Sequence, residues 1–313
     1  MAEHSSIEWT EATWNPITGC SVVSPGCTNC YAMKLAGGRL QHHPSRKGLT
    51  VDSRSGAVWN GKVRLNENWL SQPLHWRRGR DIFVCAHGDL FHPSVPDAWI
   101  DMVFGVMALA RSHRFQVLTK RSARMRDYLT DPRRLRRLLE VVVPHPTGHA
   151  ALSKLIDFAA FEAPLPNVML GVSVEDEPRA QERLPALRAT PAAARFVSYE
   201  PALGPVDWAP WLTDGLIHQV ICGGESGHGA RPIHPDWARA SRDACSGAGV
   251  AFFFKQWGGW VAEDQAPAST EWDGEATPFH LFADGQEVWN VGKRWSGRSL
   301  DGVVHSDTPK VAA

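Results

Sequence analysis

The fold is decided by the stretch DIFVCA at residues 81–86 together with the stretch SVPD at 94–97. DIFVCA is a short apolar run rich in residues that favour strands, which is typical of a buried β-strand. SVPD has the Ser, Pro and Asp of a helix N-terminus. The apolar residues after it recur at helical spacing, at Ile100, Val103 and Met107. The two stretches therefore predict one strand followed by one amphipathic helix.

The same alternation continues toward the C-terminus. Apolar runs of strand length follow at 115–119, 167–173, 195–199, 218–222 and 250–254, with helical patterns between several of them. Strands that are apolar almost throughout and alternate with helices indicate parallel βαβ units whose sheet is covered on both faces. The sequence therefore predicts an α/β fold with a partial or full (β/α) barrel of parallel strands. An open doubly wound sheet is the main alternative.

Length and local composition predict how the chain is divided. A chain of 313 residues is long enough for two domains, but α/β barrels of this size often form a single unit. We expect residues 1–258 to form the barrel, with an irregular insertion at about 41–79 that holds one short helix near 66–70, and a second insertion at about 140–166. Residues 259–313 are rich in Gly, Asp and Trp, and we expect a loop-rich C-terminal appendage there.

Net charge identifies no partner, because 33 Lys and Arg are balanced by 33 Asp and Glu. The charge is unevenly distributed along the chain, since the segment 111–137 holds ten basic residues and only two acids. Lys and Arg dominate the binding of phosphate backbones. This segment therefore indicates either a contact with DNA or RNA or a solvated helix face.

The chain shows no sign of export or membrane insertion. Residues 1–14 are polar and contain no signal-peptide core, and no apolar run reaches the roughly 18 residues of a membrane span. We therefore expect a cytoplasmic protein with no membrane partner. Its six cysteines are expected to be reduced thiols, because disulfide frameworks are typical of oxidising compartments.

Polar residues stand directly after the predicted strands. Because the carboxyl ends of parallel strands form the ligand site of barrels and open sheets alike, these residues predict one shared site. A simple contact of strand ends with water is the alternative for any single strand. The residues are His87, Asp89, Thr119, Lys120, Arg121, Ser173, Glu175, Ser198, Glu200, Glu225, Ser226, Lys255 and Gln256.

Three cysteines, Cys20, Cys27 and Cys30, lie close together in a loop rich in Gly, Pro and Ser. Three thiolates can hold three irons of a [4Fe-4S] cluster, which leaves the fourth iron open to a substrate or cofactor. A zinc ion is the main alternative and would need a fourth ligand such as His42 or His43. A thioredoxin-like redox pair at Cys27 and Cys30, or three unrelated buried thiols, are further alternatives.

The cysteine loop resembles the cluster loop of radical S-adenosyl-L-methionine (SAM) enzymes, through NPITGC at 15–20 and CTNCYA at 27–32. The resemblance is closest to the spore photoproduct lyase-like branch of that superfamily. It continues in Gly88-Asp89, in Thr119-Lys120-Arg121 and in Gly171-Val172-Ser173, which are similar to the motifs after the second, third and fourth strands of that branch.

The whole chain further resembles an uncharacterised family of phage-associated proteins. The marks of that resemblance are IEWT at 7–10, GGESG at 223–227 and FKQWG at 254–258. Two features depart from the usual radical SAM pattern. Six residues rather than three separate the first two cysteines, and Asn29 stands where an aromatic residue often contacts adenine, so that Tyr31 would take that place.

The resemblance implies cofactors and residue roles. Cys20, Cys27 and Cys30 would bind a [4Fe-4S] cluster, and the open iron would chelate SAM, which one electron cleaves to a 5′-deoxyadenosyl radical. Cys85 would return a hydrogen atom to a product radical, with a buried core cysteine as the alternative. The implied SAM-binding residues are Tyr31 for adenine, Asp89 for the amino group, Lys120 and Ser173 for the carboxylate or ribose, and Glu200 for the ribose hydroxyls. Glu225 is expected to line the same pocket, because the glycines around it let the backbone approach a ligand.

The expected function is therefore that of a radical SAM enzyme that modifies or repairs a nucleic acid base or nucleotide. An electron donor such as a flavodoxin or a ferredoxin would be its protein partner. A radical SAM enzyme that acts on a peptide or small metabolite is the first alternative. A non-enzymatic iron–sulfur or zinc-binding protein of phage origin is the second.

Overall fold

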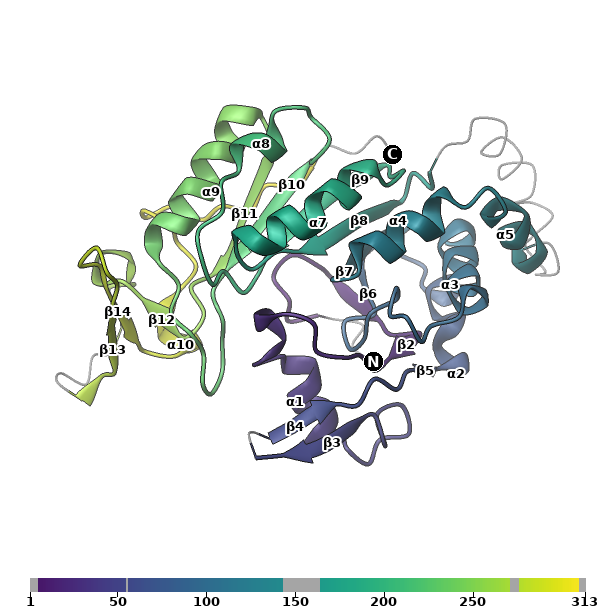
Figure 1. Cartoon of the computed structure of the whole chain (residues 1–313), viewed down its shortest axis with the longest axis horizontal. Coiled ribbons are helices and arrows are strands. Elements are labelled where there is room, and N and C mark those ends of the chain that lie inside the picture. Colours follow the sequence, from purple (N-terminus) through teal and green to yellow (C-terminus); the bar gives the residue numbers. More distant parts are fainter. Residues whose placement is uncertain (1–4, 55, 143–163, 271–275, 310–313) are drawn as a thin grey trace.

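The computed structural model of the chain describes residues 5–54, 56–142, 164–270 and 276–309 (Figure 1). Most of the predicted second insertion, at 143–163, lies outside these described residues, as do short parts of the predicted C-terminal appendage. Within the described ranges, no helix combines the length and the apolar character needed to cross a membrane.

A seven-stranded sheet forms the centre of the molecule, and all of its neighbouring strands are parallel. Its strands lie in the order β1 (Ala12–Trp14), β6 (Asp81–Val84), β7 (Arg114–Thr119), β8 (Val168–Ser173), β9 (Ala194–Tyr199), β10 (Gln219–Gly223) and β11 (Ala251–Gln256). This is also their order along the chain, so every crossover moves in one direction. A doubly wound sheet reverses that direction at a switch point. The sheet instead curls into a partial barrel (Figure 1), and the predicted α/β fold is confirmed.

The first strand, β1, has no counterpart among the predicted strands. With three residues it is too short to show a periodic pattern. Tertiary packing holds it in place: Trp14 is fully buried, and its ring lies 5.8 Å from that of Phe115 on β7. The Trp14 indole nitrogen also donates a hydrogen bond of 2.8 Å to the carbonyl of Trp69.

Helices cover the outer face of the sheet (Figure 1). Five of them directly follow a strand of the sheet, and one more packs on these: α3 (Asp97–Leu109), α4 (Ser122–Thr130), α7 (Glu177–Ala189), α8 (Ala209–Leu212) and α9 (Pro235–Ala248), with α5 (Arg134–Val142) on α3. Ile82 and Val84 lie in the main core with the helices. Phe83 between them points to the inner face, as strand alternation requires, where it packs on Trp9 at 4.8 Å.

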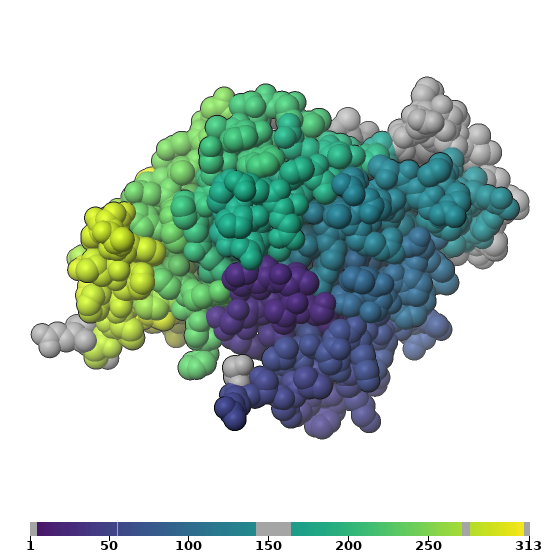
Figure 2. All heavy atoms as spheres, viewed as in Figure 1, coloured from purple at the N-terminus to yellow at the C-terminus, as the bar shows by residue number. Residues whose placement is uncertain are grey.

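Residues 31–65 form a small lobe beside the barrel (Figures 1 and 2). It consists of α1 (Tyr31–Gly37), the hairpin of β3 (Thr50–Ser53) and β4 (Gly56–Trp59), and β5 (Arg64–Leu65), which pairs with β2 (Ile17–Thr18). Helix and hairpin are in close contact, since a Cβ on Gly37 would lie 1.9 Å from that of Ala57. The sequence predicted an irregular insertion here, and the hairpin was missed. The residues of β3 are mostly exposed, so they do not show the alternation of apolar and polar residues that indicates a strand. The predicted short helix is α2 (Glu67–Leu70), followed by the 3-10 helix η2 (Gln72–His75).

The described part of the C-terminal appendage contains a three-stranded antiparallel sheet, made of β12 (Trp260–Val261), β14 (Glu287–Asn290) and β13 (Phe279–Leu281), with the 3-10 helix η3 (Glu263–Gln265) and the short helix α10 (Lys293–Ser296). Aromatic contacts tie it to the barrel. Phe282 packs edge-on against His234, at the start of α9, with ring centroids 4.6 Å apart. Most of its described residues lie outside these short elements, so the appendage is rich in loops, as its composition predicts.

Candidate functional site

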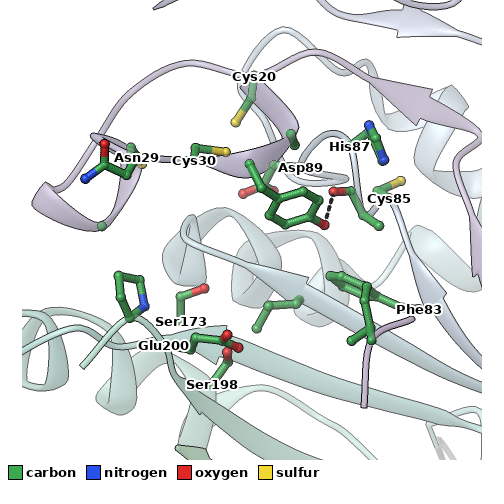
Figure 3. A pocket seen from close by; sticks show the side chains of 18 of the residues that line it. Cys20, Asn29, Cys30, Phe83, Cys85, His87, Asp89, Ser173, Ser198 and Glu200 are labelled. Atoms are coloured by element: carbon green, nitrogen blue, oxygen red, sulfur yellow. Dashed lines mark hydrogen bonds between the residues drawn. The ribbon is translucent and has the colours of Figure 1, made fainter. Parts of the chain in front are cut away.

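A cavity of about 640 Å³ opens at the carboxyl ends of the strands, beneath the cysteine loop. Figure 3 shows Cys20 and Cys30 on one side of it, with Ser173, Ser198 and Glu200 on the opposite side. The ten residues predicted from the sequence as site residues all line this cavity: Cys20, Cys27, Cys30, Tyr31, Cys85, Asp89, Lys120, Ser173, Glu200 and Glu225. The structure therefore brings the whole predicted set together.

Arg121 anchors the first cysteine. Its Nη1 lies 3.3 Å from Cys20 Sγ, and its Nη2 donates hydrogen bonds to the Ser21 carbonyl at 2.8 Å and to the Ser21 hydroxyl at 3.0 Å. The side chain is only 9% exposed, so its charge is held against the loop. Burial raises the pKa of the Cys20 thiol to about 12, and the Asp89 charge adds to this, while the Arg121 charge opposes it.

Asp89 holds Arg121 in this position. One of its oxygens accepts hydrogen bonds from the Phe91 amide at 3.0 Å and the Thr119 hydroxyl at 2.7 Å. The other accepts from the Lys120 amide at 3.1 Å and from Arg121 Nη1 at 2.8 Å. Four protein donors thus occupy the carboxylate, and its predicted role as the acceptor for the SAM amino group stays a prediction.

Lys120 is engaged in a similar way. Its ammonium group forms an ion pair with Glu175, a fully buried carboxylate that also accepts from Arg183 at 3.1 Å and from the Ser24 hydroxyl at 3.0 Å. Burial raises the pKa of Glu175, but the charges of Lys120 and Arg183 outweigh it and hold that pKa below its usual value. Glu175 therefore packs directly against the cysteine loop. A Cβ on Gly26 of that loop would lie 2.5 Å from Glu175 Cγ.

The glycine-rich loop after β10 fixes the other end of the cysteine loop. Glu225 accepts a hydrogen bond of 2.9 Å from the Asn29 amide group and forms a two-oxygen ion pair with Arg231. Asn29 also donates to the Gly229 carbonyl at 2.8 Å. Asn29, at the position where an aromatic residue often contacts adenine, is thus a structural bridge between the two loops.

The two sequence marks GGESG and FKQWG pack against each other. A Cβ on Gly224 would lie 1.9 Å from the carbonyl oxygen of Trp257, so only glycine allows this approach. The Gly224 amide donates to the Gln256 carbonyl at 2.9 Å, and the Gly259 amide donates to the Glu225 carbonyl at 2.7 Å. These contacts fix the position of Glu225 in the cavity wall.

Ser173 and Ser198 are paired neighbours at the ends of β8 and β9, and their hydroxyl groups face the cavity (Figure 3). Glu200 follows Ser198 and forms an ion pair of 2.6 Å with Lys255 at the end of β11. Strand register explains this grouping, because residues at the carboxyl ends of neighbouring parallel strands lie side by side. These groups offer hydroxyl and carboxylate oxygens to a ligand.

Tyr31 presents its ring to the cavity and is 51% exposed. Its hydroxyl donates a hydrogen bond of 2.7 Å to the Ala86 carbonyl, which fixes the ring. The His87 ring lies edge-on to it at 5.9 Å. Burial, with a contribution from the charge of Arg46, lowers the pKa of His87 to about 4, so this imidazole is neutral at physiological pH.

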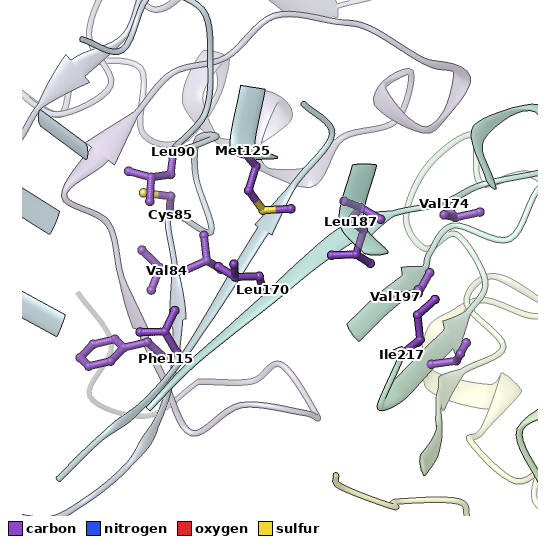
Figure 4. Close-up of a cluster of buried hydrophobic side chains, with 14 of the residues drawn as sticks. Val84, Cys85, Leu90, Phe115, Met125, Leu170, Val174, Leu187, Val197 and Ile217 are labelled. Atoms are coloured by element: carbon purple, nitrogen blue, oxygen red, sulfur yellow. The ribbon is translucent and has the colours of Figure 1, made fainter. Parts of the chain in front are cut away.

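Cys85 contributes to the cavity wall, but its side chain packs in the main core with Val84 and Leu90 (Figure 4). Simple alternation from Phe83 would turn Cys85 toward the barrel interior. The strand ends at Val84, however, and Cys85 adopts a left-handed φ of 58°. Burial raises the pKa of its thiol to about 12. The packing matches the alternative of a core cysteine, and the hydrogen-donor role stays a prediction.

Several cavity residues were not assigned roles by the sequence alone. Arg121 and His87 stand directly after strands, and that position is the signal that could have identified them. Glu175, which also follows a strand, does not line the cavity but is buried behind it against the cysteine loop. Arg39 and Trp59 also line the cavity, but they come from the lobe, and nothing in the local sequence marks them.

The basic segment 111–137 is largely neutralised by ion pairs. Eight of its ten basic residues contact a carboxylate in the described structure: Arg114 (with Asp81), Lys120 (with Glu175), Arg121 (with Asp89), Arg124 (with Asp97), Arg126 (with Asp127), Arg133 (with Asp131), Arg136 (with Glu140) and Arg137 (with Asp101). Four of these carboxylates come from residues 81–101, outside the segment. A count of charges along the sequence therefore overstates the positive charge available there to a partner.

Comparisons with solved structures find spore photoproduct lyase. A cysteine-to-serine variant of that enzyme matches with a TM-score of 0.38 and 11% identity, over 92% of this chain and 70% of that chain. The same enzyme in complex with a dinucleoside spore photoproduct matches with a TM-score of 0.35 and 10% identity, over 88% and 66%. A doubly substituted variant with bound AdoMet and the dinucleoside spore photoproduct gives 0.37 and 10%, over 89% and 67%.

No curated protein matches the chain. A family model does match, over residues 4–309, which is nearly the whole sequence. Its description is "Protein of unknown function (DUF5131)". The chain therefore belongs to the DUF5131 family.

Proposed function

We propose that this protein is a radical SAM enzyme that binds a [4Fe-4S] cluster through Cys20, Cys27 and Cys30 and modifies or repairs a nucleic acid base or nucleotide. The observation that carries the proposal is that these three cysteines line one cavity together with the polar ends of the parallel strands. Its volume of about 640 Å³ lies within the range of roughly 300–1,000 Å³ that is usual for cofactor and ligand sites. Thiolates are the usual protein ligands of iron–sulfur clusters.

A single zinc ion is the alternative occupant of the three cysteines. Among the described residues, three ligand atoms within 4.8 Å of one another are found at His234, Asp236 and Asp284, and the three cysteines form no such group. Two thiolates on one zinc ion, each at about 2.3 Å, lie no more than about 4.6 Å apart. Three thiolates on three different irons of a cubane are spread more widely.

The expected fourth zinc ligands are also placed elsewhere. Neither His42 nor His43 lines the cavity. His43 Nδ1 lies 2.6 Å from the Ser45 hydroxyl, and its ring packs against Trp69. The His234 ring, in the other candidate group, already uses Nδ1 to accept from the Asp236 amide and Nε2 to pair with Asp284.

In the proposed site, cluster and SAM together would supply a 5′-deoxyadenosyl radical. The residues of this chain bind and orient the SAM molecule. Tyr31 offers a fixed aromatic face to the adenine ring, since its hydroxyl is tied to Ala86. Ser173 offers a hydroxyl and Glu200 a carboxylate to the ribose and to the methionine part of SAM.

Asp89, Lys120 and Arg121 act as positioning residues in this proposal. Asp89 fixes Arg121, which donates to Cys20. Lys120 fixes Glu175 beneath the cysteine loop. Hydrogen bonds to cysteine sulfur influence the reduction potential of iron–sulfur clusters, so Arg121 would also tune the electron transfer that starts the reaction.

A nucleic acid substrate is supported by the charge beside the cavity. The lobe of residues 31–65 contains seven Lys or Arg and one acid, and its residues Arg39 and Trp59 line the cavity. A positively charged surface of this kind attracts phosphate backbones.

Anaerobic reconstitution with iron and sulfide tests the proposal. We expect about four irons and four sulfides per chain, which Cys20→Ala, Cys27→Ala and Cys30→Ala each abolish. Cys245→Ala is the matched control, since this cysteine is buried in α9 away from the cavity and should leave the iron content unchanged. With dithionite and SAM, the reconstituted protein should release 5′-deoxyadenosine.

Two results would contradict the proposal separately. One tightly bound zinc ion per chain, with no cluster formed under any reconstitution condition, would exclude the cluster. A complete cluster that never yields 5′-deoxyadenosine would leave a non-enzymatic iron–sulfur protein.

A further inference from the structure

The lobe of residues 31–65 is a second positively charged part of the described structure. It carries Lys34, Arg39, Arg46, Lys47, Arg54, Lys62 and Arg64 against Asp52 alone, a formal charge of 7 − 1 = +6. The whole chain is neutral, so the remaining residues carry −6. The lobe projects from the barrel next to the cysteine loop (Figure 2).

These charges are not neutralised by carboxylates. Arg64 donates to the carbonyls of Pro44 and Lys47, and Arg46 lies over the Trp69 ring. Lys34 donates to Asn29 and to the His228 carbonyl. In the described part of the chain, no ion pair joins any of the seven to an acid, whereas eight of the ten basic residues in 111–137 have one.

Arg39 places one of these charges at the cavity. Four other cations line it, and each has a carboxylate partner: Lys120 (Glu175), Arg121 (Asp89), Lys255 (Glu200) and Lys293 (Glu8). Arg39 is exposed and has no such partner among the described residues. It stands two residues after the end of α1, and Cys30 directly precedes that helix. Because α1 is roughly 10 Å long, the proposed cluster ligand Cys30 and Arg39 flank opposite ends of one short helix.

We propose that the lobe binds the phosphate backbone of a nucleic acid strand, with Arg39 contacting the phosphate next to the nucleotide that enters the cavity. This inference rests on the proposed function, and it assigns the substrate surface to residues 31–65 instead of 111–137. Lys47 and Lys62 of the same lobe are also exposed. An unpaired guanidinium suits this role, because it can donate two parallel hydrogen bonds to a phosphate group.

Oligonucleotide binding tests the inference without any catalytic step. The probe is a fluorescein-labelled single-stranded DNA of 20 nucleotides, with RNA and duplex DNA of the same sequence in parallel, and affinity is measured by fluorescence anisotropy over a series of KCl concentrations. The triple variant Arg39→Ala, Lys47→Ala, Lys62→Ala should bind at least tenfold more weakly than the wild type. Its slope of log affinity against log salt should become shallower by about 0.7 for each phosphate that the variant no longer neutralises.

The matched control removes the same charge from the other basic segment. Arg126→Ala, Arg133→Ala, Arg136→Ala lowers the net charge by three at exposed sites that pair with acids, and it should change affinity by no more than about twofold. Equal weakening by both triple variants would overturn the inference, because overall charge would then explain binding. A poly-glutamate peptide that binds the lobe as tightly as the oligonucleotides would also overturn it.

The inference and the proposed function can fail separately. SAM cleavage by the wild-type protein without any oligonucleotide reports on the proposed function alone. Cleavage without salt-dependent oligonucleotide binding would overturn the inference and leave a radical SAM enzyme with another substrate. Binding through the lobe without SAM cleavage would support the surface and overturn the enzyme. Circular dichroism of each variant establishes that a loss of binding is not a loss of folding.

Discussion

Arg121 Nη1 lies 3.3 Å from Cys20 Sγ and 2.8 Å from Asp89 Oδ2, so one guanidinium joins the end of β7 to a predicted cluster ligand 101 residues away. The ion pair is almost completely buried, with 9% of the Arg121 and 6% of the Asp89 side chain exposed. A buried charge pair of this kind is costly to break, because the remaining charge is left without a partner in a poorly solvated site. The relationship therefore couples the stability of the barrel to the position of Cys20.

We expect Arg121→Gln to reduce the free energy of unfolding by about 3–5 kcal/mol, because it leaves the Asp89 carboxylate buried and uncompensated. Urea denaturation measures this change. The double variant Arg121→Gln, Asp89→Asn should recover part of the loss. Arg126→Gln is the control, because its ion pair with Asp127 is exposed and should contribute no more than about 1 kcal/mol. Equal effects of the two single substitutions would contradict the structural role given to Arg121.

Gly26→Ala should displace the cysteine loop, since the added methyl group would lie 2.5 Å from Glu175 Cγ. Overpacking of this kind costs about 1–3 kcal/mol, and the iron bound after reconstitution should fall together with stability. In the control, Gly247→Ala on α9, the new methyl group meets no atom within 4 Å. It should stabilise the protein by about 0.5–1 kcal/mol through the higher helix propensity of alanine. A fully loaded and equally stable Gly26→Ala protein would show that the loop is not seated on Glu175.

Tyr31→Ala should weaken SAM binding to the reconstituted protein, because it removes the aromatic face proposed for adenine. Stacking of a base on an aromatic ring is worth about 1–3 kcal/mol, which corresponds to a change of roughly 5- to 160-fold in affinity. Tyr31→Phe keeps the ring and removes only the hydrogen bond to Ala86, so its effect should be smaller. Equilibrium dialysis with labelled SAM measures both. The same affinity in all three proteins would exclude Tyr31 from the adenine site.

His87 should make the protein less stable in mild acid. Burial lowers its pKa from 6.5 to about 4, so the unfolded state takes up a proton between these pH values and the folded state does not. The stability contributed by the neutral imidazole is complete above pH 6.5, decreases as the pH falls toward 4, and changes no further below that value. The difference in unfolding free energy between wild type and His87→Gln, measured at pH 7, 5.5 and 4.5, should therefore shift in favour of the variant.

His42→Gln, at an exposed position, controls for the loss of an imidazole in that experiment. It should follow the wild-type pH dependence throughout. If His87→Gln also follows the wild type, the His87 ring is solvated and is not part of the buried cavity wall.

Much of the fold could be predicted because it depends on local pattern. Six of the seven strands of the sheet are mostly apolar runs, and several of the helices between them show apolar residues at helical spacing. The exceptions are informative. β1 is too short for a pattern and depends on the burial of Trp14, and the β3–β4 hairpin is held by its packing on α1. Both form through contacts with residues that are distant in sequence.

The composition of the cavity wall could also be predicted, for a geometric reason. The carboxyl ends of parallel strands meet at one edge of a sheet, so Asp89, Ser173 and Glu200 share a cavity although more than 100 residues separate the first from the last. The hydrogen bonds and ion pairs that each of these side chains forms could not be predicted. Cys85, for example, follows the strand end with a left-handed φ of 58° and packs in the main core at the edge of the cavity.

The sequence alone determined the parallel α/β architecture and the types of side chain that line the cavity, because periodicity and residue type are local properties. Only the tertiary structure decided which charges remain available. It pairs most of the arginines in 111–137 with carboxylates, many of them from other elements, and it leaves Arg39 beside the cavity without one. The reason is that Coulomb interactions depend on distance in space and on burial, and neither can be counted along the chain.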